Sequence, residues 1–191
     1  MNVIRLVITV LLALLAIFLG YRLYKTIQEP ILFEKNKVVR DEANIAKLKD
    51  LRSLELAYKS RFGRFAGGID TLKSFAKSGK LPILKRIGDP NDSTKVSRVD
   101  TLWVTVIDSL FKGNVAWVDT LGRVPYTGGE KYDVRSGIIN KNDVLIPAFE
   151  ISAPYTTVYK GLIQKYYTDK VGKDMRVGSM LDGTTTGNWE N

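Results

Sequence analysis

The stretch Leu6-Val-Ile-Thr-Val-Leu-Leu-Ala-Leu-Leu-Ala-Ile-Phe-Leu-Gly20-Tyr21 decides how this chain is organised. It carries no charge, and as a helix it would extend for about 24 Å, somewhat less than a hydrocarbon core of about 30 Å. Arg5 and Arg22 flank it and can extend their charged ends to the two interfaces. We therefore predict a transmembrane anchor over residues 1–25, whose apolar surface includes Leu6, Leu11, Leu12, Leu15, Phe18 and Leu19.

Two features bear on processing and topology. A cleaved signal peptide has a similar charge and apolar run, but residues 16–22 lack the small-x-small cleavage pattern, and a chain without cysteine has no lipoprotein site. The positive charges after the anchor favour a cytoplasmic head by the positive-inside rule. An apolar segment at the very N-terminus is also the usual form of an export signal-anchor. We predict a single-pass inner-membrane protein with a periplasmic head.

Composition narrows the function. Because the chain of 191 residues contains no cysteine and no histidine, it lacks disulfides, thiolate nucleophiles and the commonest general base. An enzyme would need a Ser/Lys pair or paired carboxylates, and we predict a non-enzymatic protein without a cofactor. The net charge of +9 is concentrated in the first half. We expect this basic stem to lie beside anionic lipid headgroups, and we predict no nucleic-acid binding.

A second, amphipathic stem helix is predicted over residues 26–66. Pro30 lacks an N–H group and favours a kink or a restarted helix after Glu29. Beyond it, apolar residues recur at threes, fours and sevens, the spacing of one helix face. The charged residues between them, such as Lys47 and Glu55, define a predicted solvent-facing side. We predict that the apolar stripe binds other envelope or secretion proteins or further copies of the chain, although its second half could equally pack on the head; it comprises Val38, Ile45, Leu48, Leu51, Leu54 and Tyr58.

Residues 67–191 are predicted to form an α+β globular head. We expect Gly63 to end the stem helix as a left-handed residue, and Asp70 to cap a short helix that buries Leu72 and Phe75. Tight turns between successive strands predict a small antiparallel sheet, with Pro147 on an edge strand. Strands are predicted at residues 102–107, 114–120, 123–126, 131–134 and 144–152, with turns at 127–130 and 140–143. The end of the chain is predicted to contain either a short helix near residues 158–166 or two further strands.

Two smaller patterns in the head concern ligands. Residues 89, 91, 93 and 100 have the spacing of a calcium loop, but Thr94 stands where the sharp turn needs glycine, so we predict no calcium there. Trp103, Trp117 and Trp189 are predicted to pack in the core or at its edge rather than to bind a ligand.

The predicted layout, a transmembrane helix that continues into a long amphipathic helix packed on a small antiparallel sheet, resembles the pilin fold of type IV pili and type II secretion pseudopilins. The stretch from Ala57 to Phe65, followed by Leu72, looks like the pseudopilin segment with a helix tyrosine before glycine, an aromatic residue and leucine. The tail from Gly178 to Trp189 is similar to the C-terminal loop of major pseudopilins. The general layout is also similar to single-span envelope proteins of Bacteroidota.

The resemblance to pseudopilins implies a metal ligand and a role. In that family the C-terminal loop binds calcium, which would implicate Asp182, although Thr185 and Thr186 replace the acidic residues before Asn-Trp. Residues 3–24 also lack the prepilin peptidase site and the glutamate that pilins carry in the apolar run. We predict a structural or assembly component of a secretion or pilus-like machine. The alternative is a membrane-tethered binding domain for a peptide or glycan, whose isolated head from about Gly67 would fold and bind alone.

Overall fold

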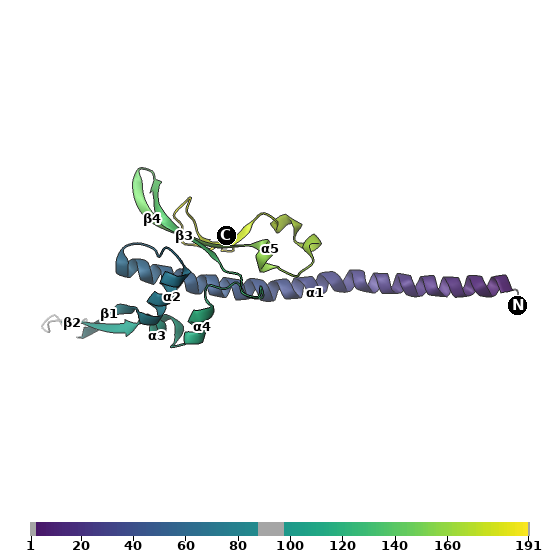
Figure 1. The fold of residues 1–191 in the computed structure, drawn as a ribbon, viewed down its shortest axis with the longest axis horizontal. Coiled ribbons are helices and arrows are strands. Elements are labelled where there is room, and N and C mark those ends of the chain that lie inside the picture. Colours follow the sequence, from purple (N-terminus) through teal and green to yellow (C-terminus); the bar gives the residue numbers. More distant parts are fainter. Residues whose placement is uncertain (1–2, 88–97, 191) are drawn as a thin grey trace.

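The computed structural model describes residues 3–87 and 98–190, and one long helix dominates it (Figure 1). Helix α1 extends from Val3 to Phe62 over 60 residues. It ends where predicted, because Gly63 adopts a φ of 72° and its N–H donates to the Lys59 carbonyl over 2.8 Å. The predicted anchor and the predicted stem helix therefore form one continuous helix.

The break predicted at Glu29-Pro30 is wrong, because α1 remains helical through Pro30. A proline inside a helix removes one hydrogen bond and costs about 3 kcal/mol. Contacts around the proline offset this cost. The Glu29 carboxylate lies 3.4 Å from Lys25 Nζ and 3.3 Å from Lys165 Nζ, and Phe33, one turn later, is buried in the head. The head thus begins to cover α1 at the very turn that contains the proline.

The first part of the head lies on one side of α1 (Figure 1). It consists of α2 (Ile69–Ser78), β1 (Lys80–Ile87), β2 (Arg98–Thr105), α3 (Val106–Phe111) and α4 (Val115–Thr120). Strands β1 and β2 form a two-stranded antiparallel sheet in the described part of the chain, with Pro82 opposite Trp103. The calcium-loop spacing at residues 89–97 lies outside the described residues.

Three details of this part correct the sequence predictions. Asp70 lies inside the first turn of α2, and the N-cap is Gly68, which makes no side-chain bond. The strand predicted at 114–120 is helix α4, because the Asn114 side chain accepts the Trp117 N–H over 3.0 Å and starts a helix. The strand predicted at 102–107 ends at Thr105, which caps α3 by accepting the Asp108 N–H.

The second part of the head lies on the other side of α1 and contains a three-stranded antiparallel sheet. The strands β3 (Asp133–Lys141), β4 (Val144–Pro154) and β5 (Asp174–Gly178) lie in the order β3-β4-β5. Asn142 and Asp143 form the predicted turn between β3 and β4 with φ values of 51° and 64°. Pro147 is on the central strand, not on an edge strand. It faces no partner in β5, however, because β5 pairs only with Glu150–Pro154.

The sequence predicted one antiparallel meander, but the structure contains two separate sheets. Helix α1 lies between them, and core residues pack on both sides of α1. The strand predicted at residues 123–126 is reduced to an isolated bridge between Arg123 and Lys131, and the strand predicted at 131–134 overlaps the start of β3 at Asp133. Between β4 and β5 the chain forms α5 (Tyr155–Val158) and the 3-10 turns η1 (Gln164–Tyr166) and η2 (Thr168–Lys170). The core joins Leu48, Leu51 and Leu54 of α1 to side chains from both parts, which include Leu72, Phe75, Val106, Val118, Phe149, Ile151 and Val177.

Candidate functional site

The predicted anchor is bare helix. Every residue from Val3 to Ile27 is exposed, and none of the apolar window is buried against the rest of the described chain. By length and composition the helix is compatible with a single membrane span, and a signal sequence has the same signature. The predicted lipid-facing residues are 47% to 62% exposed: Leu6, Leu11, Leu12, Leu15, Phe18 and Leu19.

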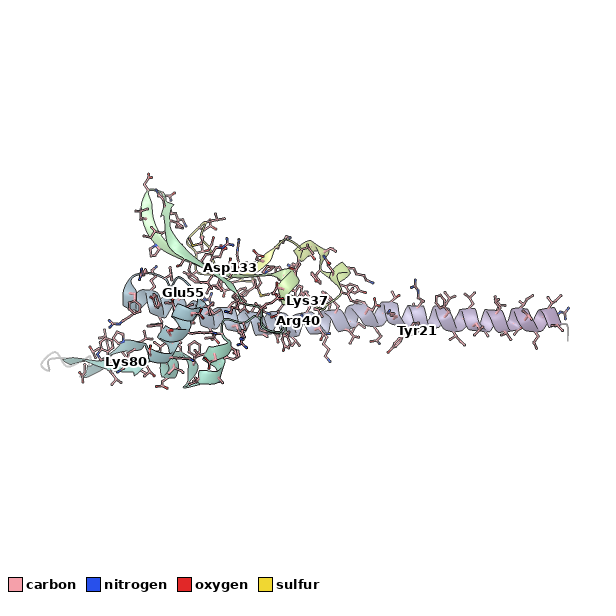
Figure 2. All side chains as sticks on the ribbon, viewed as in Figure 1. Tyr21, Lys37, Arg40, Glu55, Lys80 and Asp133 are labelled. Atoms are coloured by element: carbon pink, nitrogen blue, oxygen red, sulfur yellow. The ribbon has the colours of Figure 1, made fainter. Side chains whose placement is uncertain are left out.

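The threonine hydroxyl groups of this part of α1 are bonded within the helix. The Thr9 hydroxyl donates to the Arg5 carbonyl over 2.9 Å, and the Thr26 hydroxyl donates to the Arg22 carbonyl over 2.8 Å. Each hydroxyl is therefore satisfied within the helix, without water. Tyr21 lies on the bare part of α1 beyond the head (Figure 2). Its ring is 63% exposed, and aromatic side chains of this kind are enriched at the interfaces of membrane-spanning helices.

Most of the predicted interaction stripe packs on the head. Leu48, Leu51 and Leu54 are fully buried in the core, and Ile45 and Tyr58 are partly buried against it. Val38 alone among the six predicted stripe residues is exposed, at 50%. The alternative that the second half of the stripe packs on its own head is therefore what the structure shows. Leu48, Leu51 and Leu54 are not accessible to another chain.

The predicted solvent-facing side of the stem is also partly covered. Lys47 is buried, and its Nζ donates to the carbonyl oxygens of Thr120 over 2.6 Å and Arg123 over 3.1 Å. Burial lowers the pKa of Lys47, and the nearby Arg123 charge contributes. Asp50 accepts the Trp117 indole N–H over 2.7 Å. These polar residues of α1 therefore bind the stem to the head, on a side of the helix that the sequence pattern predicted to face solvent.

Glu55 is the most unusual of these polar groups. It is fully buried, and one carboxyl oxygen accepts the Ala66 N–H over 2.8 Å. Its other oxygen, Oε1, has no hydrogen-bond partner among the described residues. Burial raises the pKa of Glu55 from 4.5 to about 7, and the Ala66 bond opposes this shift. The carboxyl holds the loop that connects α1 to α2 (Figure 2).

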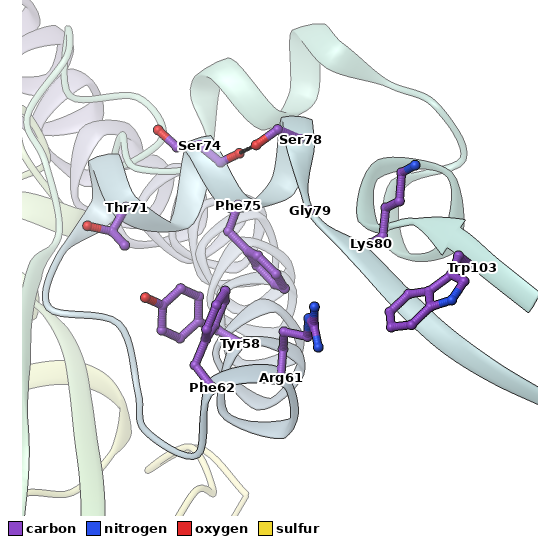
Figure 3. Close-up of a pocket in the computed structure, with 10 residues that line it drawn as sticks. All are labelled: Tyr58, Arg61, Phe62, Thr71, Ser74, Phe75, Ser78, Gly79, Lys80 and Trp103. Carbon is purple, nitrogen blue, oxygen red and sulfur yellow. Dashed lines mark hydrogen bonds between the residues drawn. The ribbon is translucent and has the colours of Figure 1, made fainter. Parts of the chain in front are cut away.

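An open aromatic cleft lies at the end of α1 that is far from the anchor (Figure 3). We call it the distal cleft; its volume is about 640 Å³. The rings of Tyr58, Phe62 and Phe75 form one wall, with centroid distances of 4.5 to 5.8 Å. Phe62 is 53% exposed and Trp103, on the opposite wall, is 50% exposed. The other lining residues are Arg61, Thr71, Ser74, Ser78, Gly79 and Lys80.

The electrostatic character of the distal cleft is positive. The Arg61 guanidinium lies 5.2 Å from the centroid of the Trp103 ring, and Lys80 lies on the strand that leads from the cleft (Figure 3). No carboxylate is among the described residues that line the cleft. Aromatic faces beside cations suit a ligand with an apolar side chain and a negative charge. The Ser78 hydroxyl is already bonded to the Ser74 carbonyl, over 2.8 Å.

Apolar surface continues from the cleft onto both hairpins. On β1 and β2, Leu84 is 69% exposed, and Ile83 and Leu102 are exposed on the other face. On the second hairpin, Ile138 and Leu145 are exposed near the tip. A second hollow of about 470 Å³ lies between this hairpin and the loop after α1; it is lined by Tyr58, Arg64, Phe65, Gly67, Thr71, Ser136, Gly137, Ile138 and Pro147. Exposed apolar residues gathered in this way are typical of binding surfaces.

The predicted metal ligand Asp182 lies in a different place, in the tail loop after β5. Its carbonyl accepts a bond from Lys141 Nζ over 2.8 Å, and its N–H donates to the Ser179 hydroxyl over 3.2 Å. A small polar hollow of about 90 Å³ is lined by Asp182 and Arg176 with hydroxyl and amide side chains. Among the described residues no group of three or more acidic side chains could hold a metal. One carboxylate beside an arginine does not fit the carboxylate-rich oxygen set of calcium.

Sequence reasoning missed the distal cleft. The available signal was the i, i+4 spacing of Tyr58 and Phe62 at the end of the stem, which places both rings on one side of the helix. Trp103 was expected to pack in or beside the core, but half of it is exposed at the cleft. Trp117 and Trp189 do pack against the core as predicted.

Comparisons with protein-family models, with curated proteins and with solved structures found no match to this chain. The resemblance to pilins and pseudopilins therefore rests on the layout and the short stretches quoted above. What the structure adds is the α+β arrangement itself, with a long apolar N-terminal helix and small antiparallel sheets.

Proposed function

We propose that this chain is a non-enzymatic, membrane-anchored assembly protein of the cell envelope, and that it serves as a structural component of a secretion or pilus-like machine. One observation carries the proposal: exposed apolar surface lies at each of the two ends of α1. The anchor residues lie at one end, and the distal cleft with its two apolar hairpins lies at the other. Extended apolar surface on a folded chain marks contact with a membrane or with other proteins.

The geometry suits an assembly role because α1 fixes the distance between these two surfaces. From Arg22 at the end of the anchor to Phe62 at the cleft, the helix rises by about 60 Å. The head is fastened along this length by side-chain bonds at Glu29, Arg40, Asn44 and Lys47. The cleft is thus held at a set height above the membrane on the side where the head lies, which we take to be the periplasmic side.

The partner surface in this proposal differs from the predicted stripe. Leu48, Leu51 and Leu54 are buried in the head, so partner chains bind at the distal cleft and along the hairpins. The non-enzymatic assignment is supported by the lack of histidine and cysteine. Glu55, whose raised pKa would suit a general acid or base, is enclosed by the core and does not line the cleft.

A second candidate function is favoured by the cleft alone: a membrane-tethered domain that binds an acidic peptide. The volume of about 640 Å³ lies within the usual range of ligand pockets. Arg61 and Lys80 would pair with a carboxylate while an aromatic or aliphatic side chain contacts Phe62 and Trp103. A glycan could stack on the aromatic rings, but it would leave Arg61 and Lys80 without an anionic partner.

Site-specific crosslinking tests the assembly proposal, and it is clean because the natural chain has no cysteine. Single cysteines replace Leu84 or Leu145 at the distal surface and Val38 on the stem, and a short bifunctional maleimide is added to cells that express the full chain. We expect discrete protein adducts from the two distal positions and none from Val38. Prior labelling with a membrane-impermeant maleimide in spheroplasts reports which side of the membrane the head occupies.

The other outcomes are equally informative. Adducts from Val38 alone would show that the stem mediates assembly and would refute the distal surface. Fully reactive cysteines that form no adduct at any of the three positions would refute the assembly role and leave the tethered binding domain. Labelling that requires membrane permeabilisation would place the head in the cytoplasm and remove the envelope-assembly proposal.

A further inference from the structure

The part of the head closest to the anchor lies against the turn of α1 that contains Glu29. The segment between α5 and η2 reaches farther toward the N-terminal end of α1 than any other part of the head (Figure 1). Lys165 Nζ and the Tyr166 hydroxyl each lie 3.3 Å from the Glu29 carboxylate. Phe33 stacks on the Tyr167 ring at 6.1 Å and contacts Tyr166 at 5.3 Å. These contacts hold residues 161–165 beside the stem at a defined height.

This height places the segment at the membrane surface. Arg22 marks the end of the apolar run, and seven residues of helix separate it from Glu29, a rise of about 10 Å. The headgroup region on one side of a bilayer is about 5 to 8 Å thick. An anchor that inserts up to Arg22 therefore brings the lower edge of the head to the boundary between headgroups and water, and any tilt of α1 lowers one side of that edge further.

The side chains at this edge combine apolar and positively charged groups. Ile27 and Leu32 are exposed on α1, and Ile163 is exposed on the adjacent segment. Leu32 and Ile163 border a hollow of about 110 Å³, with Leu162 and Phe33, that opens between stem and head. Lys25 and Lys165 both lie at Glu29, so one carboxylate is shared by two ammonium groups and a positive charge remains. The hydrogen bond from Lys165 lowers the pKa of Glu29, and Lys25 contributes.

We propose that residues 161–165 and the turn Ile27–Leu32 of α1 form a second membrane contact that binds the headgroups of anionic phospholipids. Ile27 lies within the headgroup layer and Ile163 enters it as α1 tilts toward this side, while Lys25 and Lys165 bind lipid phosphates. The partner is an anionic bilayer because exposed aliphatic side chains flanked by surplus lysine charge complement it. The contact sets how the head is turned relative to the membrane. This inference rests on the proposed insertion of the anchor.

The test uses the full chain in vesicles of phosphatidylcholine, with or without phosphatidylglycerol, and with brominated lipids as short-range quenchers. Single cysteines at Ile163 or Ile27 carry a fluorescent label. Matched controls are Leu12→Cys in the anchor and Leu84→Cys at the distal hairpin. We expect loss of fluorescence at Leu12, Ile163 and Ile27, no loss at Leu84, and stronger quenching at Ile163 when phosphatidylglycerol is present.

The controls separate failure of this inference from failure of the anchor. Quenching at Leu12 and Ile27 without quenching at Ile163 would overturn the second contact and leave the anchor in place. No quenching at Leu12 would overturn the anchor and the second contact together. Quenching at Ile163 with an unquenched Leu12 would also overturn the proposal, since the head would then bind lipid without an inserted helix.

Removal of the two lysine charges tests whether the bound headgroups are anionic. In the Lys25→Gln/Lys165→Gln variant, the effect of phosphatidylglycerol on quenching at Ile163 should be lost, whereas Lys112→Gln at the far side of the head should keep it. High salt should weaken the same effect, because the Debye length falls from about 10 Å at 0.1 M to about 3 Å at 1 M. An unchanged effect in the double variant and at high salt would overturn the assignment to anionic headgroups.

Discussion

The phenolic hydroxyl of Tyr132 donates a hydrogen bond to the amide oxygen of Asn44 over 2.6 Å, inside the head. Both side chains are buried, and the Asn44 Nδ2 group donates in turn to the Arg40 carbonyl over 2.8 Å. Burial also raises the pKa of Tyr132, which keeps its proton on the oxygen. The bond joins the stem to the segment that enters β3, so stem and head form one folding unit.

The first prediction concerns this bond. Asn44→Ala leaves the Tyr132 hydroxyl buried without an acceptor, and we expect the free energy of unfolding to fall by about 1–3 kcal/mol. Denaturant unfolding of the full chain in detergent measures it. The double variant Asn44→Ala/Tyr132→Phe should lose less than the sum of the two single variants. Strict additivity would show that the two groups do not interact, and Ser53→Ala, on the exposed side of α1, serves as the control.

The second prediction distinguishes a core role from a partner role for the stem stripe. Leu48→Asp places a charge in the core at a fully buried position. We expect it to unfold the head, since an unpaired buried charge and the lost packing together cost several kcal/mol. Val38→Asp, at the exposed end of the stripe, should leave the unfolding midpoint nearly unchanged. A folded Leu48→Asp head that only fails to associate would restore the stripe as an interface.

The third prediction concerns where the chain can be cut. A fragment that starts at Gly67 lacks Leu48, Leu51 and Leu54, and each lost leucine removes about 2–5 kcal/mol of core packing. We expect it to be unfolded, whereas a fragment that starts at Gln28 keeps every buried residue of α1 and should fold. Circular dichroism and dispersion of amide NMR signals decide between them. A folded fragment from Gly67 would support an independent binding domain with the stem as a spacer.

The fourth prediction concerns pH. In the folded chain the Glu55 carboxyl has a pKa of about 7, whereas the ordinary value is 4.5. Between these values the folded state binds more protons than the unfolded state, so the free energy of unfolding falls as the pH rises, by at most about 3 kcal/mol. In Glu55→Gln the Ala66 bond can be kept, and this pH dependence should become weaker. Thermal unfolding of both proteins at pH 5.5 and pH 8 measures the difference, with about 1 kcal/mol as a resolvable change.

Other titrating groups set the background of that experiment. Burial also raises the pKa of Asp41, and this shift has the same sign as that of Glu55. Hydrogen bonds from lysine lower the pKa of Glu29, Asp119 and Glu130, and the Gly187 N–H, with Arg52, lowers the pKa of Glu190. The contribution of these groups to stability is lost only as the pH falls through the carboxyl range. Equal slopes in the two proteins would show that Glu55 ionises as freely in the folded chain as in the unfolded chain.

The fifth prediction concerns calcium at the tail loop. Because Asp182 is joined there by Arg176 rather than by further carboxylates, we expect no change in melting temperature between millimolar calcium and excess EGTA. Asp182→Asn should behave in the same way. A calcium-dependent rise that Asp182→Asn abolishes would establish the metal site that the pseudopilin resemblance implies.

The sequence was sufficient for the features that depend on local pattern. The uncharged run of 16 residues, Leu6 to Tyr21, predicted the exposed helix, and the positive φ available to Gly63 predicted where α1 ends. Leu72 and Phe75 were correctly assigned to the core, as was the turn at 140–143. These features are decided by hydrophobicity and backbone geometry within a few residues, which a single sequence contains.

Features that depend on tertiary contacts were not predictable in this way. Lys47 and Glu55 look like solvent-facing residues in a helical pattern, but they are buried because the head covers α1 on two sides. The β-branched residues between Asn114 and Thr120 favoured a strand, and the cap at Asn114 overrode them. The distal cleft joins Phe62 to Trp103, which lie 41 residues apart and meet only once α2 and the β1–β2 hairpin are in place.

The continuity of α1 through Pro30 has a mechanical consequence. With no joint between the exposed apolar half of α1 and the head, any tilt of the proposed anchor would be transmitted along the whole rigid helix. Membrane helices commonly tilt by about 20°, and over the roughly 60 Å from Arg22 to Phe62 such a rotation would sweep the distal cleft sideways by about 20 Å. A local change in bilayer thickness or in lateral packing would thus be converted into a large change in where a bound partner is presented.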